Sequence, residues 1–205
     1  MPIEELLTRE GLAPPVRIMV LALVAVWRGD WQMLRECGRT SRARGSARQD
    51  LEETLLQAVL FCGFPRVVTA FEELHEVWPA ATPPAGGALP LAEQAAAGEA
   101  VFATIYGKNQ EAVHTMLRSF HADFHDFVLQ AAYGRILTRP HLSPRIREVL
   151  AVAVLAAQDQ LRQFVGHARG ALHFGSTKAE LREALVTVFG ESPQVDQWLS
   201  RVRSR

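Results

Sequence analysis

Four polar side chains in the second half of the chain have the types and the spacing for acid–base chemistry. Gln160, Gln163 and His167 lie at i, i+3 and i+7, which is one face of a helix. Glu148 stands eleven residues before Asp159, and His167 stands eight residues after it. If the two segments pair as antiparallel helices, a rise of about 1.5 Å per residue leaves Glu148 and His167 about 4–5 Å apart in height. A carboxylate that faces an imidazole in this way is suited to proton transfer.

A purely structural role explains the same two residues. Glu148 lies in the first turn of its predicted helix, where the helix dipole favours an acid. His167 lies beside an apolar stripe and is also suited to be a partly buried packing residue. Spacing alone favours this structural role over a catalytic one.

A second pair of histidines has a spacing that can hold a metal ion. His121 and His125 lie at i and i+4 on a predicted helix. The pattern is not H-E-x-x-H, because Ala122 occupies the position of the acid. The apolar stripe of this helix consists of Phe120, Phe124, Phe127 and Val128. The histidines flank that stripe, so we expect a solvated or substrate-facing helix and no metal site.

Three consecutive helices are predicted to position the polar set. Ser143 suits an N-cap, and the residues 149–157 are all apolar, which indicates a helix buried on every side. Gly175 suits the end of the second helix, and Thr177 with Glu180 forms a capping box for the third. The second helix has a one-sided apolar stripe of Leu161, Phe164, Val165, Ala168 and Leu172.

Two sequence motifs in this region resemble a known family. LRQFVGHARGALHFGSTKAELREAL, residues 161–185, resembles the core motif of the carboxymuconolactone decarboxylase family. YGRILTRPHLSPRIREVL, residues 133–150, resembles the family's approach to the same helix. The resemblance implies the all-α, alkyl hydroperoxide reductase D-like (AhpD-like) fold that these proteins share.

The resemblance also assigns expectations to the polar set. In the peroxidase branch of the family, a Glu, a Cys-x-x-Cys pair and a His fall at the positions of Glu148, Gln160, Gln163 and His167. Both thiols are glutamine here, so hydroperoxide reduction is disfavoured. The decarboxylase branch also lacks the thiol pair and implies proton transfer without a metal or an organic cofactor.

Two functions remain open after this resemblance. The first is a cofactor-free lyase acting on a small anionic lactone-type carboxylate, with Glu148 and His167 as the acid–base pair. In that case Arg135 or Arg147 would hold the substrate carboxylate. The remaining candidate substrate-binding residues are Tyr133, Gln160 and Gln163. The second is a non-catalytic binding or assembly protein on the same fold.

An internal repeat is predicted from a shift of 130 residues. The shift aligns Arg17 with Arg147 and Glu53 with Glu183. The same shift pairs Arg39 with Arg169, Gly45 with Gly175, Ser46 with Ser176, Leu51 with Leu181 and Leu55 with Leu185. We therefore predict two pseudo-repeated AhpD-like helical units, residues 1–78 and residues 91–205, joined by a Pro/Gly linker over residues 79–90.

The first unit lacks the polar set. Its corresponding residues are Ile18, Asp30, Met33 and Cys37. We therefore expect any family-type site to lie in the second unit. A lone reactive thiol at Cys37 is one alternative, but a buried small hydrophobe is the more frequent case.

Composition restricts the partners and the compartment. Lys plus Arg and Asp plus Glu both number 22, so no net field favours nucleic acid or an anionic membrane. The longest apolar runs, residues 18–27 and 149–157, are shorter than the roughly 20 residues that span a bilayer. The two cysteines are too few for a disulfide framework, and the start has no positively charged leader region, so we expect a cytoplasmic protein.

The same features lead to an expectation about assembly. Duplicated members of the resembled family form trimers, and the all-apolar helices indicate more hydrophobic surface than one chain hides. We expect a homo-oligomer, with a trimer favoured over a dimer.

Overall fold

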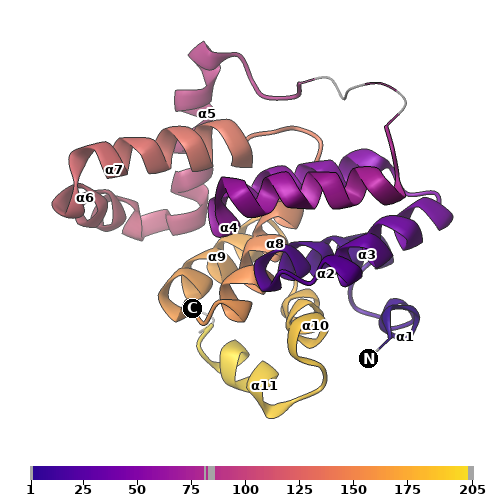
Figure 1. Ribbon diagram of the computed structural model, residues 1–205. Coiled ribbons are helices and arrows are strands. Elements are labelled where there is room, and N and C mark those ends of the chain that lie inside the picture. The colour runs from indigo at the N-terminus through magenta and orange to yellow at the C-terminus, as the bar shows by residue number, and fades with distance from the viewer. Residues whose placement is uncertain (1, 81, 83–85, 203–205) are drawn as a thin grey trace.

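The computed structural model describes residues 2–80, 82 and 86–202, and within these residues every regular element is helical (Figure 1). The expected all-α fold class is therefore confirmed. The helices follow one another as α1 (Ile3–Leu7), α2 (Pro14–Arg28), α3 (Trp31–Ala43), α4 (Arg48–Val77), α5 (Leu91–Tyr106), η1 (Gly107–Asn109), α6 (Gln110–Phe120), α7 (Ala122–Phe127), η2 (Val128–Leu137), α8 (Pro144–Ala157), α9 (Leu161–His173), α10 (Lys178–Phe189) and α11 (Pro193–Ser200).

The first three long helices, α2 to α4, pack together in the N-terminal half. Every residue of α2 from Val16 to Val26 is buried, as its apolar sequence requires. Gly29 ends α2 in the left-handed conformation, and the Asp30 carboxylate accepts a hydrogen bond from the Met33 N–H at 3.0 Å to cap α3. α4 is two helices in succession, because Gly63 has φ 74° and ψ 167°.

The helices α8 to α10 form the corresponding set in the C-terminal half. Ser143 caps α8, as expected, and α8 is buried along most of its length. The predicted capping box is confirmed: the Glu180 N–H donates to Thr177 Oγ1 at 3.1 Å, and the Thr177 N–H donates to Glu180 Oε2 at 2.8 Å. Asp159, between α8 and α9, has φ 57°, the same left-handed turn that Gly29 makes between α2 and α3.

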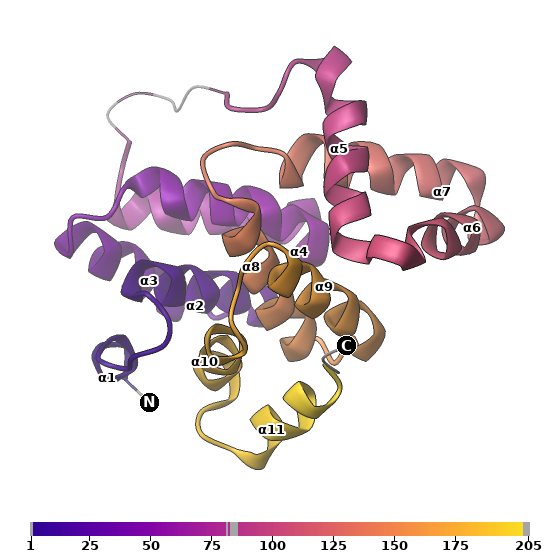
Figure 2. The ribbon, with the colours of Figure 1, turned by 180° about the vertical axis from the view of Figure 1, so that it is seen from behind.

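Two hydrophobic clusters divide the molecule into a body and an arm. The body contains α1 to α4 and α8 to α11, and its core includes α2 and α8 almost entirely. The arm contains α5 to η2, with a small core of Phe102, Ile105, Tyr133 and Leu137. Figures 1 and 2 show the arm projecting to one side of the body. The arm lies within the predicted second unit, and its separate cluster was not expected. The domain boundaries stay a prediction, and part of the expected linker lies outside the described residues.

Two buried ion pairs join the halves in a reciprocal way. Arg17 of α2 lies 3.0 Å from Glu183 of α10, and Arg147 of α8 lies 2.8 Å from Glu53 of α4. Both arginines and both glutamates are separated from their counterparts by the same 130 residues. A reciprocal exchange of this kind is typical of a two-fold interface. It supports the internal repeat, which stays a prediction.

The outer contacts of these pairs follow the same pattern. Arg9 adds a second guanidinium to Glu183 at 2.7 Å, and Arg139 does the same for Glu53 at 2.6 Å. Arg9 and Arg139 are again 130 residues apart. Each half therefore supplies the carboxylate that neutralises the buried arginine of the other half.

One helix of the described residues, α4, is long and apolar enough to cross a membrane by length and composition alone. Its backbone breaks at Gly63, and Pro65 begins the next turn. The two straight parts, residues 48–62 and 64–77, are each shorter than the roughly 20 residues that a bilayer requires.

Candidate functional site

Glu148 of α8 and His167 of α9 are in direct contact. His167 Nδ1 lies 2.9 Å from Glu148 Oε2. The hairpin of α8 and α9 brings them to the same level, which is the geometry that the spacing allowed. The Glu148 side chain is 2% exposed and that of His167 is 12% exposed. The imidazole is therefore the member of the pair that solvent or a ligand can reach; a catalytic role for the pair stays a prediction.

Burial and charge act in opposite directions on His167. Burial by itself lowers its pKa, but the negative charge and the hydrogen bond of Glu148 outweigh burial and raise the His167 pKa above its ordinary value of 6.5. Because Nδ1 faces Glu148, Nε2 is the ring nitrogen that remains for proton transfer to a ligand. The arrangement can hold a proton on a partly accessible imidazole near neutral pH.

A glycine on α9 makes room for the carboxylate. A Cβ at Gly170 would lie 2.6 Å from Glu148 Oε2 and 3.0 Å from Ile105 of α5. The 2.6 Å distance to Glu148 Oε2 is shorter than real Cβ contacts, so a side chain at position 170 would displace Glu148. Gly170 follows His167 by three residues, on the same face of the helix. The sequence reasoning missed this residue, although its spacing from His167 was visible.

Tyr106 is a second residue that the sequence reasoning did not assign to the site. Its hydroxyl lies 2.9 Å from the hydroxyl of Tyr133, a predicted site residue. Burial raises the pKa of both phenols, and the negative charge of Glu148 adds to the rise. A Cβ at Gly166 would lie 3.3 Å from the Tyr106 ring, which places this ring against α9 one residue before His167. The Ile-Tyr-Gly motif at 105–107 was the available signal.

The predicted glutamines lie on the exposed side of α9. Gln160 is exposed and its amide N–H donates to the Gln158 carbonyl at 3.3 Å. Gln163 is exposed as well, and Arg135 is exposed at the end of η2. All three are accessible to a ligand from solvent, and their role in binding one stays a prediction.

Arg147 requires a correction. It is 1% exposed, and its guanidinium donates to Glu53 Oε2 at 2.8 Å, to the Arg139 carbonyl at 3.0 Å and to Gln57 Oε1 at 3.3 Å. These bonds occupy the guanidinium inside the body. Arg147 is therefore not available to a substrate carboxylate. It lies next to Glu148 in the sequence, but consecutive residues of a helix point to different faces.

His121 and His125 do not face each other, although their i, i+4 spacing allows it. The His121 side chain is 66% exposed, and its Nδ1 accepts a hydrogen bond from the Asp123 N–H at 3.1 Å. His125 is buried and contacts His114 of α6 instead. Within the part of the chain that the structure describes, no three His, Cys, Asp or Glu side chains converge as a metal site.

The thiols lie away from the Glu148–His167 pair. Cys37 and Cys62 are free, and burial raises the pKa of both, that of Cys62 to about 11. Thiols that stay protonated are poor nucleophiles. The residues that replace the polar set in the first unit have structural roles: Ile18 is in the core and Asp30 caps α3.

Two cavities of the described residues are not lined by Glu148 or His167. One, of about 310 Å³, lies between the arm and the start of α8 and includes Val101, Leu137 and Arg139. The other, of about 110 Å³, lies between the α8–α9 turn and α11 and includes Asp159 and Trp198.

Comparison with known proteins relates the second half of the chain to one family and most of the chain to a further protein. Residues 122–188 match the carboxymuconolactone decarboxylase family. The chain is 36% identical over 73 residues to 4-carboxymuconolactone decarboxylase of Acinetobacter baylyi, which covers 34% of this chain and 52% of that enzyme. It is 27% identical over 188 residues to a protein named "Peroxisomal protein 2" of Schizosaccharomyces pombe, which covers 85% of this chain and 84% of that protein.

Within the described residues the protein is all-helical, and a buried carboxylate of α8 contacts an imidazole of α9. The resemblance stated from the sequence motifs is confirmed by the family match over residues 122–188 and by the similarity to 4-carboxymuconolactone decarboxylase.

Proposed function

We propose that this protein is a cofactor-free acid–base enzyme, a lyase acting on a small anionic lactone-type carboxylate. The observation that carries the proposal is the 2.9 Å contact between His167 and the buried Glu148. In the proposed reaction His167 moves the proton through Nε2, and Glu148 orients the ring and stabilises its cationic form. Arg135 is the remaining cation for the substrate carboxylate, with Tyr133, Gln160 and Gln163 as further binding residues.

The decarboxylase relative supports the choice of substrate class. Its name states an activity on 4-carboxymuconolactone, and it is 36% identical to this chain over 73 residues. The chain spans about half of that enzyme, so the same reaction is part of the proposal. Neither a metal nor a thiol is assigned to this chemistry, and we expect no hydroperoxide turnover with a dithiol donor.

Variants of the pair test the proposal. We expect turnover of carboxymuconolactone-type lactones, followed by ultraviolet absorption, to be abolished by Glu148→Gln and by His167→Ala. The double variant should be no worse than either single one, because the two residues act as a unit. Thermal melting of Glu148→Gln reports whether the fold survives this nearly isosteric change. Full activity of a folded Glu148→Gln variant would refute the assignment.

A non-catalytic binding or assembly role is the second candidate. One observation favours it: the longer match is to "Peroxisomal protein 2", a protein whose name states no reaction. A thermal-shift screen with small dicarboxylates and lactones separates the two candidates. Stabilisation that Arg135→Ala removes would favour the enzyme, whereas no stabilisation by any of them would favour the binding role.

A further inference from the structure

A chain of four polar side chains crosses the arm, apart from the Glu148–His167 pair. His114 of α6 and His125 of α7 are buried, at 4% and 5% exposed. His114 Nδ1 lies 3.0 Å from His125 Nε2. The outer nitrogens each face a carboxylate: His114 Nε2 lies 3.0 Å from Glu99 Oε1, and His125 Nδ1 lies 2.8 Å from Asp126 Oδ1.

The two carboxylates determine where the ring protons are. An ionised carboxylate only accepts hydrogen bonds, so the nitrogen that faces it must donate. When both imidazoles are neutral, each has one N–H, and its hydrogen bond to the carboxylate uses that N–H. His114 Nδ1 and His125 Nε2 then direct two lone pairs at each other across 3.0 Å. Two lone pairs repel at this distance, and a cation between them removes the repulsion.

The geometry of the two nitrogens fits a divalent transition-metal ion. A metal–imidazole bond is about 2.0–2.1 Å long, so two such bonds place the nitrogens about 2.9 Å apart at a right angle and about 3.3 Å apart at the tetrahedral angle. The observed 3.0 Å lies within this range. A carboxylate on the remote nitrogen is the usual arrangement that orients a metal-bound histidine, and both rings have one.

We propose that His114 and His125 bind one divalent transition-metal ion, of the kind that prefers imidazole, such as Zn²⁺ or Co²⁺. Glu99 and Asp126 would orient the rings. Two imidazoles leave the coordination incomplete, because no third His, Cys, Asp or Glu side chain among the described residues joins them. Water would supply the other ligands.

The surroundings make the site rigid and separate it from the acid–base pair. Gln110 donates to Glu99 Oε1 at 2.5 Å, which holds the carboxylate in place. The Phe102 ring lies 4.3 Å from the His114 ring and 4.5 Å from the Tyr106 ring, centre to centre. An aromatic side chain therefore stands between this cluster and the tyrosines of the candidate site. The ion would tie α6 to α7 directly, and to α5 through Glu99.

Metal titration of the tag-free, EDTA-treated full chain tests the proposal. We expect one equivalent of Zn²⁺ per chain in a competition titration with a chromophoric chelator, and a visible absorption band with Co²⁺. His114→Gln and His125→Gln should each weaken binding at least tenfold. His121→Gln is the matched control, because His121 lies in the same segment with a 66% exposed side chain, and it should leave the affinity unchanged.

The opposite results would overturn the site. If the wild type binds Zn²⁺ no more tightly than the His114→Gln/His125→Gln double variant, the gap holds a shared proton and not a metal. If His121→Gln weakens binding as much as His125→Gln, the ion sits elsewhere. Should the glutamine variants fail to fold by circular dichroism, Asp126→Asn and Glu99→Gln replace them, because both leave the imidazoles intact. Each should weaken binding by about 10–100-fold, and an unchanged affinity would overturn the proposal.

Discussion

Glu148 shows how one residue depends on a small number of neighbours. Its carboxylate is buried, which is costly unless a partner shares the charge. His167 supplies that partner, and Gly170 supplies the space beside it. A larger residue at position 170 would leave no room for the contact, so the glycine belongs to the site as much as the two titratable groups do.

The pH dependence of stability should reveal the pair. The raised pKa means that the folded protein holds the His167 proton to higher pH than the unfolded chain does. The pair therefore contributes stability that is fully present below the unfolded pKa of about 6.5 and is lost as the pH rises through the higher folded value. We expect the melting temperature of the wild type to fall over this interval and that of Glu148→Gln to lack this contribution.

Thermal melts between about pH 5.5 and 9 measure this difference. Glu111→Gln is a suitable control, because Glu111 is an exposed acid on α6 and its loss should leave the pH profile unchanged. An identical alkaline fall in the wild type and in Glu148→Gln would contradict the coupling.

At the scale of elements, close approach between helices positions the site. α5 crosses η2 at Gly98 and Gly134, where a Cβ on Gly98 would lie 2.7 Å from the Gly134 nitrogen. α5 also contacts α9, since His173 Nδ1 donates to the Thr104 carbonyl at 2.8 Å. α5 therefore holds Tyr106 between η2 and α9.

Gly98→Ala should disrupt this crossing. The new Cβ would meet main-chain atoms, which cannot rotate away, so we expect a loss of about 1–3 kcal/mol in the free energy of unfolding. Gly166→Ala is the matched control in a helix, because its Cβ would meet only the Tyr106 ring at 3.3 Å. Its effect should stay within about 1 kcal/mol, since the helix gains propensity from alanine. Urea unfolding of both variants measures the difference, and equal losses would argue against the backbone crossing.

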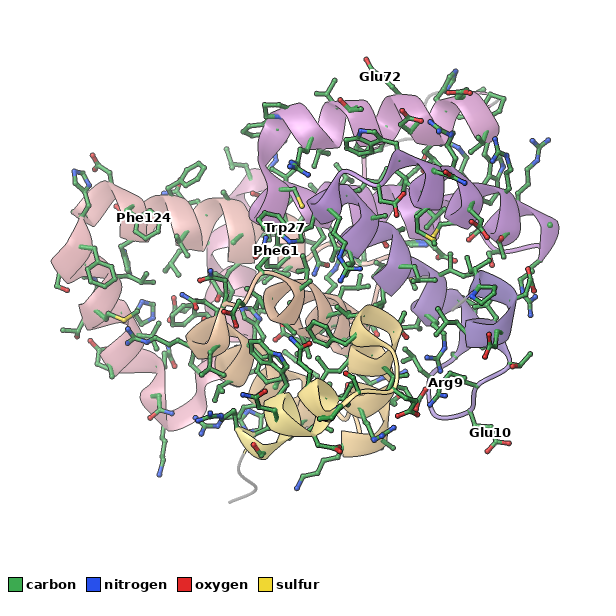
Figure 3. The ribbon with its side chains drawn as sticks, turned by 60° about the horizontal axis from the view of Figure 1, so that its bottom comes forward. Arg9, Glu10, Trp27, Phe61, Glu72 and Phe124 are labelled. Carbon is green, nitrogen blue, oxygen red and sulfur yellow. The ribbon has the colours of Figure 1, made fainter. Side chains whose placement is uncertain are left out.

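At the scale of the whole molecule, reciprocal ion pairs join the two halves. Arg17 and Arg147 are the largest fully buried side chains, and each depends on a glutamate from the other half. Figure 3 shows Arg9, next to the first of these pairs, at the opposite side of the molecule from Phe124 of the arm. The buried ion pairs that join the two halves lie in the body and do not involve the arm helices α5 to α7.

Removing either buried arginine should be costly. Arg17→Met and Arg147→Met each leave a carboxylate in the interior with fewer partners, so we expect a loss of about 3–5 kcal/mol from each. Arg145→Met removes a more exposed pair with Glu180, whose arginine side chain is 38% exposed, and should cost less than about 1 kcal/mol. Denaturant unfolding checks these values; similar small losses in all three variants would show that the buried pairs do not join the halves.

Acid should weaken the same pairs. Burial by itself raises the Glu53 pKa, but hydrogen bonds from Arg139 and Arg147 outweigh burial and lower it; the bond from Arg9 is the main cause that lowers the Glu183 pKa. A lowered pKa contributes stability that is present above the ordinary value of 4.5 and is lost as the pH falls through the folded value. We expect Glu183→Gln to be less stable than the wild type at pH 7 and to lose less stability on acidification, measured by melting between about pH 7 and 2.5. A constant difference from the wild type over this range would contradict the assignment.

Assembly is the last prediction at this scale. Phe64 on α4 is 70% exposed. Phe120 on the arm is 64% exposed, and Phe124 and Phe127 are further exposed aromatic side chains on the arm. We propose that such surfaces are covered in a homo-oligomer, with a trimer favoured over a dimer. Light scattering at micromolar concentration should give a mass about three times that of the chain, and Phe124→Ser should lower it. A monomer would refute the proposal.

The sequence by itself determined the helices, their caps and the resemblance to a family over the second half. Apolar periodicity, capping residues and left-handed turns act over a few neighbouring residues, so they can be predicted locally: Ser143, Thr177 and Glu180 lie where their types require. The similar heights of Glu148 and His167 followed from helical rise once the two segments were taken to pair as antiparallel helices.

The tertiary structure decided which polar side chains face which. Arg147 and Glu148 are adjacent in the sequence, yet Arg147 donates to Glu53 and Glu148 contacts His167. Helix packing gives each face of α8 a different neighbour. His125 meets His114 and not His121, because a turn between α6 and α7 folds one helix onto the other. Contacts between residues far apart in the chain depend on the relative placement of whole helices, which local patterns do not contain.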